Sequence, residues 1–273
     1  SQVNRALGGD AGVAFGIMTM VLVTSIMGGF SRDMRTKIRG MQSHIIVQSA
    51  ARDLWIKDYD ALCDEIRKIP HVVGCAPRIE YEAWMGQGGN FRDVHIVAID
   101  PERERGASEL EGYFKKGTKQ VFDLRYDDGS EPKNPGLVLG KESYGGGSPG
   151  LMTARQDGTP RLFNKTFETV GRFQSGVSDY DAHYVIMHLS AAQDFLKVDQ
   201  PARVNAFAVK VDDYEKFGRE TRGAILDALH ARRPCMSPDE HDRVGSYRCG
   251  SFRAMTWEQA RAKSEAAGWA SPP

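Results

Sequence analysis

The sequence predicts an α+β protein with one N-terminal transmembrane helix, a mixed α/β subdomain split into two strand–helix–strand halves, and an inserted antiparallel β subdomain. Three observations support this class: an uncharged apolar run at residues 11–30, strand–helix–strand patterns toward both ends of the remaining chain, and short alternating runs between them. The 273 residues, 41% of them hydrophobic and 9% aromatic, suffice for a substantial core. This composition excludes a disordered chain.

Charge is balanced over the whole chain, with 36 Lys and Arg residues against 36 Asp and Glu residues. A protein without a net positive field has no general attraction for phosphates. We therefore expect no nucleic-acid partner.

Residues 11–30 form a segment of membrane length, without a charge, a proline or an amide side chain. As a helix this segment would measure about 30 Å, which is the thickness of the hydrocarbon layer. Gly12, Gly16 and Gly28 place small residues where a helix can pack closely against another helix in lipid. We expect a transmembrane helix with an extension over residues 1–40; a signal segment and a buried soluble helix are the alternatives.

The first half of the mixed α/β subdomain is predicted over residues 41–80. Residues 44–48 are apolar and β-branched, residues 57–69 space their apolar side chains at helical intervals, and residues 72–84 return to a strand pattern. Asp58 is available to cap the helix.

The second half is predicted over residues 190–256, where Asp212 is available as a helix cap. It comprises a short helix, a strand, a long helix and a closing strand, at residues 191–196, 204–211, 214–232 and 246–255. The last residues, 257–273, are expected to form a helix leading toward a second transmembrane segment.

Between the halves, residues 81–189 are predicted to form the inserted β subdomain. Glycine and proline clusters separate its short alternating runs, which favours antiparallel strands. These strands are expected at residues 93–99, 136–139, 166–171 and 183–187.

No pattern in the chain indicates a catalytic constellation, a cofactor site or a metal site. Gly145, Gly147 and Gly150 match a dinucleotide-binding spacing, but a proline lies inside it and a polar loop follows, so a turn is expected. Asp179 and Asp181 could serve as paired carboxylates, although turn capping by Asp is much commoner. His183 and His188 are expected on opposite faces of one strand, an arrangement that does not favour a shared metal.

The four cysteines form two pairs in sequence. Cys63 falls on a predicted helix and Cys75 on a predicted strand. The two could be buried free thiols or could form a disulfide, and both alternatives remain open. Cys235 and Cys249, across a polar loop, are the better disulfide candidate.

The order of these features resembles the lipoprotein-releasing ABC permeases of the LolC/LolE type and, more broadly, the macrolide-exporter and FtsX permease superfamily. The most specific stretch is the membrane entry, GVAFGIMTMVLVTSIMGGFSRDMRTKIRGMQSHIIVQ. Further similar segments are VVGCAPRI, Ala98-Ile99-Asp100-Pro101, Leu137 to Gly140 with Lys141-Glu142, TFETVGRFQSGVSDYD and TWEQARAKSE.

The resemblance implies a first transmembrane helix and a periplasmic domain of a longer permease in the inner (cytoplasmic) membrane. ATP would be hydrolysed by a separate ABC ATPase subunit, so that the chain itself is not an enzyme. A second permease subunit, identical or different, and a lipoprotein substrate are the other implied partners.

The resemblance also implies a loop that contacts a periplasmic lipoprotein chaperone. By position this loop lies within TARQDGTPRLFNK, and its candidate contact residues are Arg155, Gln156, Asp157, Thr159, Pro160 and Arg161. An ordinary β-hairpin connection is the alternative for the same segment.

Two other functional classes stay open from the residues. A stand-alone membrane-anchored binding or regulatory module would need only the single apolar segment. An anchored hydrolase would have to use Asp179 and Asp181.

Overall fold

The computed structural model describes residues 14–29, 43–49, 55–87, 89–114, 122–125, 129, 131–143, 145, 147–154, 162–232, 252–256 and 259. The chain divides into two units, Ser1–Ile38 and Arg39–Pro273. In the first unit residues 14–29 are helical and exposed. Within the described ranges, no helix combines the length and apolar character needed to cross a membrane. Gly16 and Gly28 lie on this helix with open space at both positions, while Gly12 lies outside the described residues.

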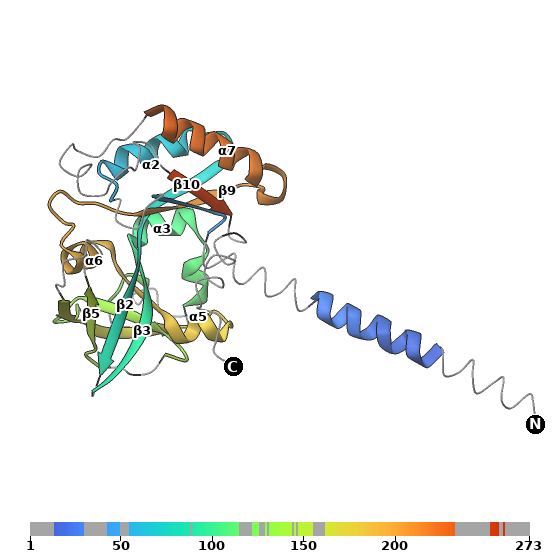
Figure 1. Ribbon diagram of the computed structural model, residues 1–273, viewed down its shortest axis with the longest axis horizontal. Helices are drawn as coiled ribbons and strands as arrows, with labels where there is room; N and C mark the ends of the chain where they lie inside the picture. Colours follow the sequence, from blue (N-terminus) through green and yellow to red (C-terminus); the bar gives the residue numbers. More distant parts are fainter. Residues whose placement is uncertain are drawn as a thin grey trace, which may run out of the picture. The chain divides into compact units, whose positions relative to one another are not determined.

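The second unit is built on one mixed ten-stranded sheet (Figure 1). Its main path runs β10-β1-β9-β2-β3-β8-β4-β7, and β5 pairs with β2 and with β6. The strands are β1 (Ile45–Ser49), β2 (Val72–Gln87), β3 (Asn90–Ile99), β4 (Gly136–Gly140), β5 (Gly150–Ala154), β6 (Leu162–Thr166), β7 (Glu168–Phe173), β8 (Tyr184–His188), β9 (Ala206–Val211) and β10 (Phe252–Thr256).

The sixteen-residue strand β2 connects the two ends of the sheet. Its first part pairs with β9 as far as Arg78, which is opposite Ala206, and its later part pairs with β3 and β5. Figure 1 shows β2 and β3 running as a long hairpin between these ends. The predicted subdomain boundary after residue 80 falls inside this strand, so the division into subdomains stays a prediction.

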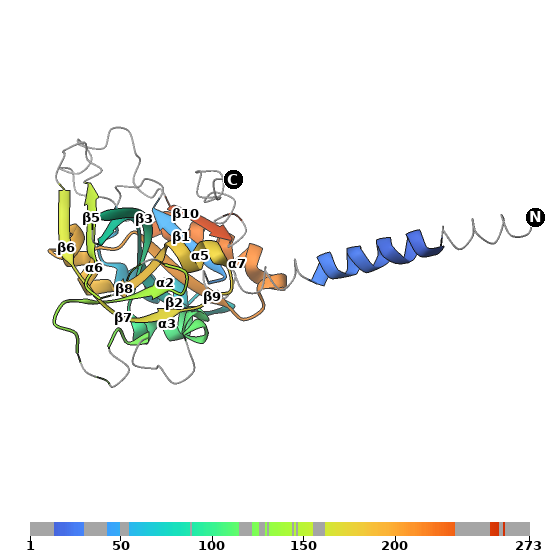
Figure 2. The ribbon, with the colours of Figure 1, turned by 90° about the horizontal axis from the view of Figure 1, so that it is seen from below.

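Helices cover both faces of the sheet near β9 and β2. Cys75 of β2 packs with the core beneath α2 (Tyr59–Arg67) and α7 (Tyr214–Arg232), whereas its neighbour Ala76 packs with Ala107 at the end of α3 (Pro101–Ala107). Successive residues of a strand point to opposite faces, so α3 lies across the sheet from the other two helices. In Figure 2 the same elements are seen from below.

The prediction of a purely antiparallel insertion is wrong. β3 pairs with β8 in parallel, and β4 pairs with β7 in parallel, while β4 and β8 are antiparallel. The parallel pairs become possible because helices connect distant strands, among them α5 (Ser178–His183), which precedes β8.

Several local expectations also need correction. Asp58 is the N-terminal cap position of α2, but its side chain makes no capping hydrogen bond. At α7 the capping carboxylate belongs to Asp213, whose Oδ1 accepts from the amide of Lys216 at 3.2 Å, and not to Asp212. His183 ends α5 and does not share a strand with His188.

Three further elements complete the described fold, two of them missed by the sequence reading. α3 begins after Asp100, whose side chain accepts from the amide of Glu102, and Pro101 occupies the first helical position. A short 3-10 helix, η1 (Leu110–Tyr113), follows it. The expected helix before β9 is α6 (Leu189–Leu196).

Candidate partner-contact site

The candidate contact residues Arg155, Gln156, Asp157, Thr159, Pro160 and Arg161 lie outside the described residues. The strands on either side of them are described: β5 and β6 are antiparallel, with Ala154 opposite Leu162. The predicted loop is therefore the connection of a β-hairpin.

The root of the hairpin is fixed on the side of β5. Trp84, Met85 and Gly86 of β2 pair with Met152, Leu151 and Gly150 of β5. The side chain of Leu151 is fully buried, and the hydroxyl of Thr153 donates to the carbonyl of Glu82 at 3.2 Å. These contacts tie the hairpin to the strand that runs through the whole sheet.

The other strand of the hairpin is tied to α6. Lys165 of β6 forms an ion pair with Asp194, which also bonds Lys197 at 2.9 Å. Hydrogen bonds from Lys165 and Lys197 lower the pKa of Asp194. Both carboxylate oxygens of Asp194 are thus engaged by cations, and β6 is held from a second element.

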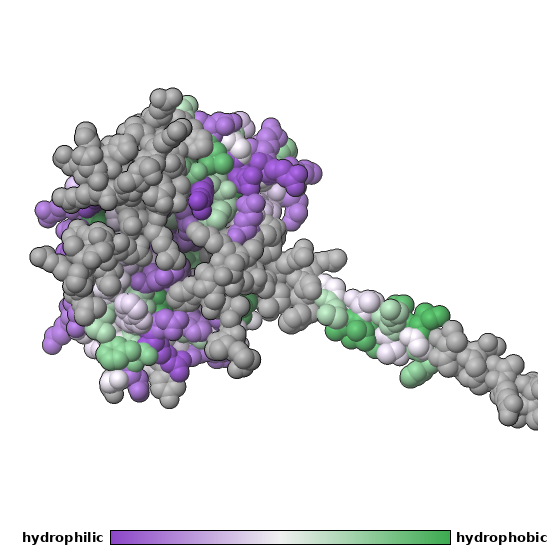
Figure 3. Space-filling model, in the orientation of Figure 1, coloured by the Kyte–Doolittle hydropathy of each residue, from purple (hydrophilic) through white to green (hydrophobic). Residues whose placement is uncertain are grey.

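The sheet around the hairpin root exposes aromatic side chains. Trp84 is 47% exposed and Phe91 60% exposed, and both belong to the β2–β3 hairpin. Phe91 lies over Gly86, where a Cβ would come within 2.6 Å of its ring. Figure 3 shows the surface of the Arg39–Pro273 unit to be mainly hydrophilic where it is not grey.

Beside η1, a cavity of about 30 Å³ is lined by the polar side chains of Arg78, Glu80, His95, Tyr180 and Tyr184 and by the apolar ones of Leu110, Val97 and Ile186. Burial lowers the pKa of His95, and Glu80 and Glu82 offset this only in part. Burial also raises the pKa of Tyr184 well above its ordinary value. The volume is enough for water molecules rather than for an organic substrate.

The two aspartates considered for hydrolysis do not form a catalytic pair. Asp181 is 2% exposed, and its carboxylate accepts from the amide and hydroxyl of Ser175, both at 2.7 Å, and from the amide of Gly176 at 3.2 Å. Asp179 lies beside His183 at 3.3 Å. The capping role expected for Asp181 is confirmed. Its carboxylate oxygens already accept hydrogen bonds from the turn at Ser175 and Gly176.

The other site predictions have different outcomes. Gly145 and Gly147 have positive φ angles and Gly150 begins a strand, which confirms a turn in place of a dinucleotide-binding helix. Cys63 and Cys75 form a disulfide, while Cys235 and Cys249 lie outside the described residues. In the part of the chain that the structure describes, no three His, Cys, Asp or Glu side chains could hold a metal ion.

Comparison with known families decides the class. The chain matches the MacB-like periplasmic core domain over residues 11–218, which is well over half of its length. This chain belongs to the MacB-like periplasmic core domain family. A MacB-like core domain is the periplasmic or extracellular domain of a membrane ABC permease, and the family is not catalytic itself.

Curated relatives of this MacB-like chain are distant. It is 24% identical over 214 residues to the lipoprotein-releasing system transmembrane protein LolE of Haemophilus influenzae, covering 74% of this chain and 49% of the relative. It is 26% identical over 199 residues to LolC of Xylella fastidiosa, covering 69% of this chain and 45% of the relative. The chain thus spans about half the length of these relatives.

Among solved structures, the periplasmic region of MacB from Actinobacillus actinomycetemcomitans is similar with a TM-score of 0.46 and 13% identity. That similarity covers 84% of this chain and 95% of the other.

Proposed function

We propose that this MacB-like chain is the periplasmic part of a lipoprotein-releasing ABC permease in the inner membrane. In this proposal a partner ABC ATPase hydrolyses ATP, and a second permease subunit completes the transporter that releases lipoproteins. The support is the similarity to two proteins named for lipoprotein release together with a β-hairpin whose connection carries the candidate contact residues.

The N-terminal unit is proposed to be the membrane helix of this permease. Residues 14–29 are helical, and every one of them is exposed, including Phe15 at 72% and Met20 at 72%. On the side seen in Figure 3, the residues of this helix are green or near white. Its hydroxyls at Thr19 and Thr24 donate to carbonyls one turn earlier in the helix. An apolar helix whose few hydroxyls are satisfied in this way favours a lipid environment over water.

The β5–β6 hairpin is proposed to present its connection to a periplasmic lipoprotein chaperone. Its two strands are held by β2 and by the Lys165–Asp194 ion pair, so that the connection starts and ends on fixed backbone. Preorganised contacts lose less conformational entropy on binding than mobile ones.

The function is tested by purifying the intact gene product in detergent and identifying the proteins that accompany it. Co-purification of an ABC ATPase, and ATPase activity that depends on the permease, are the expected results. If no ATPase accompanies the protein, the membrane-anchored binding module becomes the better interpretation.

The contact loop is tested by placing a photo-crosslinking amino acid at Arg155 or Thr159 in cells. Crosslinks to a soluble lipoprotein chaperone are expected from these positions and not from Glu220, an exposed control on α7. Equal crosslinking from Glu220, or none from the loop, would contradict this assignment.

A further inference from the structure

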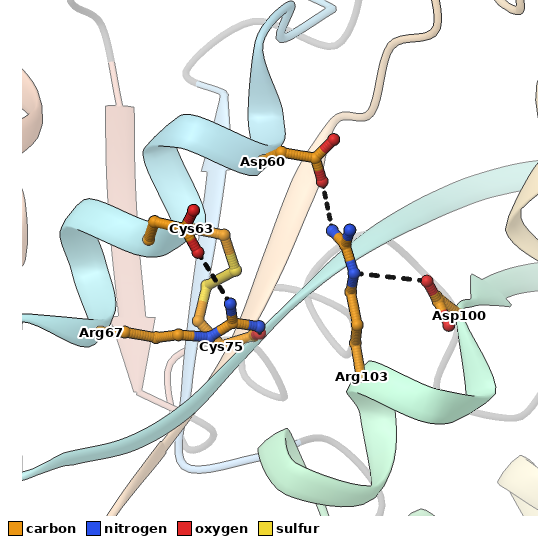
Figure 4. The surroundings of a disulfide bond; sticks show 7 residues. Asp60, Cys63, Arg67, Cys75, Asp100 and Arg103 are labelled. Carbon is orange, nitrogen blue, oxygen red and sulfur yellow. Dashed lines mark hydrogen bonds and ion pairs between the residues drawn. A yellow bond between two sulfur atoms is a disulfide. The ribbon is translucent and has the colours of Figure 1, made fainter.

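The disulfide between Cys63 and Cys75 joins helix α2 to strand β2 within the core (Figure 4). Cys63 is 0% exposed and Cys75 is 1% exposed, and both belong to the main hydrophobic cluster. Leu62 and Ile66 of the same helix are buried with them. The bond is thus closed off from solvent in the folded domain.

Polar contacts hold α2 in place on both sides of this bond. Arg67 donates to the carbonyl of Cys75 at 2.7 Å and to Asp64 at 2.9 Å. Near the start of the helix, Arg103 pairs with Asp60 and also contacts Asp100 at 3.4 Å. Figure 4 shows these two groups flanking the sulfur atoms. A reagent can reach the sulfurs only after α2 separates from β2 and α3.

Thiol–disulfide exchange requires a thiolate to approach a disulfide sulfur directly, so access controls its rate. We infer that the Cys63–Cys75 bond is made by a disulfide-bearing oxidant while α2 is still unpacked from the sheet, and that folding then seals the bond against reduction. Folding after oxidation is favoured by the short separation of 12 residues, since the two thiols meet readily in an unfolded chain.

The reaction is a two-electron exchange with the oxidant. One cysteine thiolate attacks the oxidant's disulfide, which forms a mixed disulfide and releases one oxidant thiolate. The second cysteine thiolate attacks the mixed disulfide at the sulfur of the first, which forms the Cys63–Cys75 bond and releases the other oxidant thiolate. The two protons lost by the cysteines end on the reduced oxidant.

The partner implied by this chemistry is a disulfide oxidant on the periplasmic or extracellular side, where disulfides persist. The bond joins α2 to β2 within the described core. Its occurrence between α2 and β2 makes oxidation a step in the maturation of this particular chain.

The test uses the full chain in detergent, with Cys235→Ser and Cys249→Ser so that no other cysteine reacts. In one arm, oxidised glutathione is added to the reduced chain while it is unfolded in guanidinium. In the other arm, it is added after the reduced chain has refolded. Free thiols are counted over time by alkylation and mass spectrometry. Oxidation is expected to be about a hundredfold or more faster in the unfolded chain. Equal rates in the two orders would overturn the inference.

A second measurement serves if the reduced chain fails to refold. The oxidised folded chain is treated with dithiothreitol, with and without guanidinium. The bond is expected to survive in the folded chain and to break in the unfolded one. Rapid reduction without denaturant would show that the bond is accessible and that folding does not seal it.

The oxidant is tested in cells by comparing the exported chain with the same chain retained in the cytoplasm. Alkylation should find the thiols of Cys63 and Cys75 blocked only in the exported chain. Free thiols in the exported chain would contradict the proposed oxidation step.

Discussion

Arg78 of β2 and Glu104 of α3 form a two-point ion pair inside the domain, with Arg78 Nε donating to Glu104 Oε2 at 3.0 Å. Arg78 is 2% exposed and Glu104 0% exposed. Burial alone would lower the pKa of Arg78, but the charge and hydrogen bonds of Glu104 raise it overall. The hydroxyl of Ser108 also donates to Glu104. The pair joins α3 to β2 at the point where that strand changes from β9 to β3 as its neighbour.

Replacing one partner of this pair should destabilise the domain strongly. Arg78→Met leaves the buried Glu104 carboxylate without its cation, and breaking a buried pair in this way costs about 3–5 kcal/mol of unfolding free energy. Urea denaturation measures the loss. The double variant Arg78→Met/Glu104→Leu is the control and should recover most of it. A single-variant loss as small as that of a surface ion pair would contradict the buried role.

The close approach of β2 to α3 predicts an asymmetry between two glycines. A Cβ at Gly74 would lie 2.1 Å from the carbonyl oxygen of Gly106, whereas a Cβ at Gly106 meets nothing within 4 Å. Gly74→Ala should therefore cost about 1–3 kcal/mol of stability through overpacking. Gly106→Ala should be neutral or stabilise the short helix by about 0.5–1 kcal/mol. Thermal unfolding of the two variants measures this difference in stability. Equal losses of stability in both variants would exclude the contact between Gly74 and the Gly106 carbonyl as their cause.

Loss of the disulfide should lower stability as well as change reactivity. In the chain-entropy picture a loop of this length contributes about 3 kcal/mol, so Cys63→Ala/Cys75→Ala should unfold at lower urea concentration. Wild-type protein whose disulfide has been reduced in denaturant should show a similar loss of unfolding free energy when its urea denaturation is measured with reductant present. A double variant as stable as the oxidised wild type would show that the bond adds nothing to the packing of α2.

His95 predicts a pH dependence of folding. The pKa of its imidazole is lowered because burial outweighs the attraction of the Glu80 and Glu82 carboxylates. The other polar side chains that line the cavity with His95 are Arg78, Glu80, Tyr180 and Tyr184. The unfolded chain therefore binds a proton at about pH 6.5, before the folded chain does, and stability falls as the pH drops below that value toward the folded pKa.

Urea denaturation of the wild type at several pH values between neutral and mildly acidic measures this loss. His95→Gln keeps a polar side chain without a titrating ring and should remove that part of the pH dependence. An unchanged dependence in His95→Gln would assign the effect to other groups.

Much of the local structure follows from sequence patterns alone. The apolar spacing of α2 and α7 and the β-branched runs of β1 and β9 identify these elements, because periodicity reflects which side chains face the core. α3 was missed since PERERGA is short and has no apolar stripe, although Asp100 followed by Pro101 is a typical helix start.

The sequence by itself determined where most helices and strands lie, and that no nucleotide-binding turn forms at Gly145. Only the tertiary structure decided which strands are neighbours, that Cys63 pairs with Cys75, and that Arg78 meets Glu104. The physical reason is that periodicity reports the burial of each side chain, whereas partners depend on contacts between segments far apart in the chain. The parallel pairing of β3 with β8 is such a contact, since it places His95 opposite Tyr184, 89 positions later in the chain.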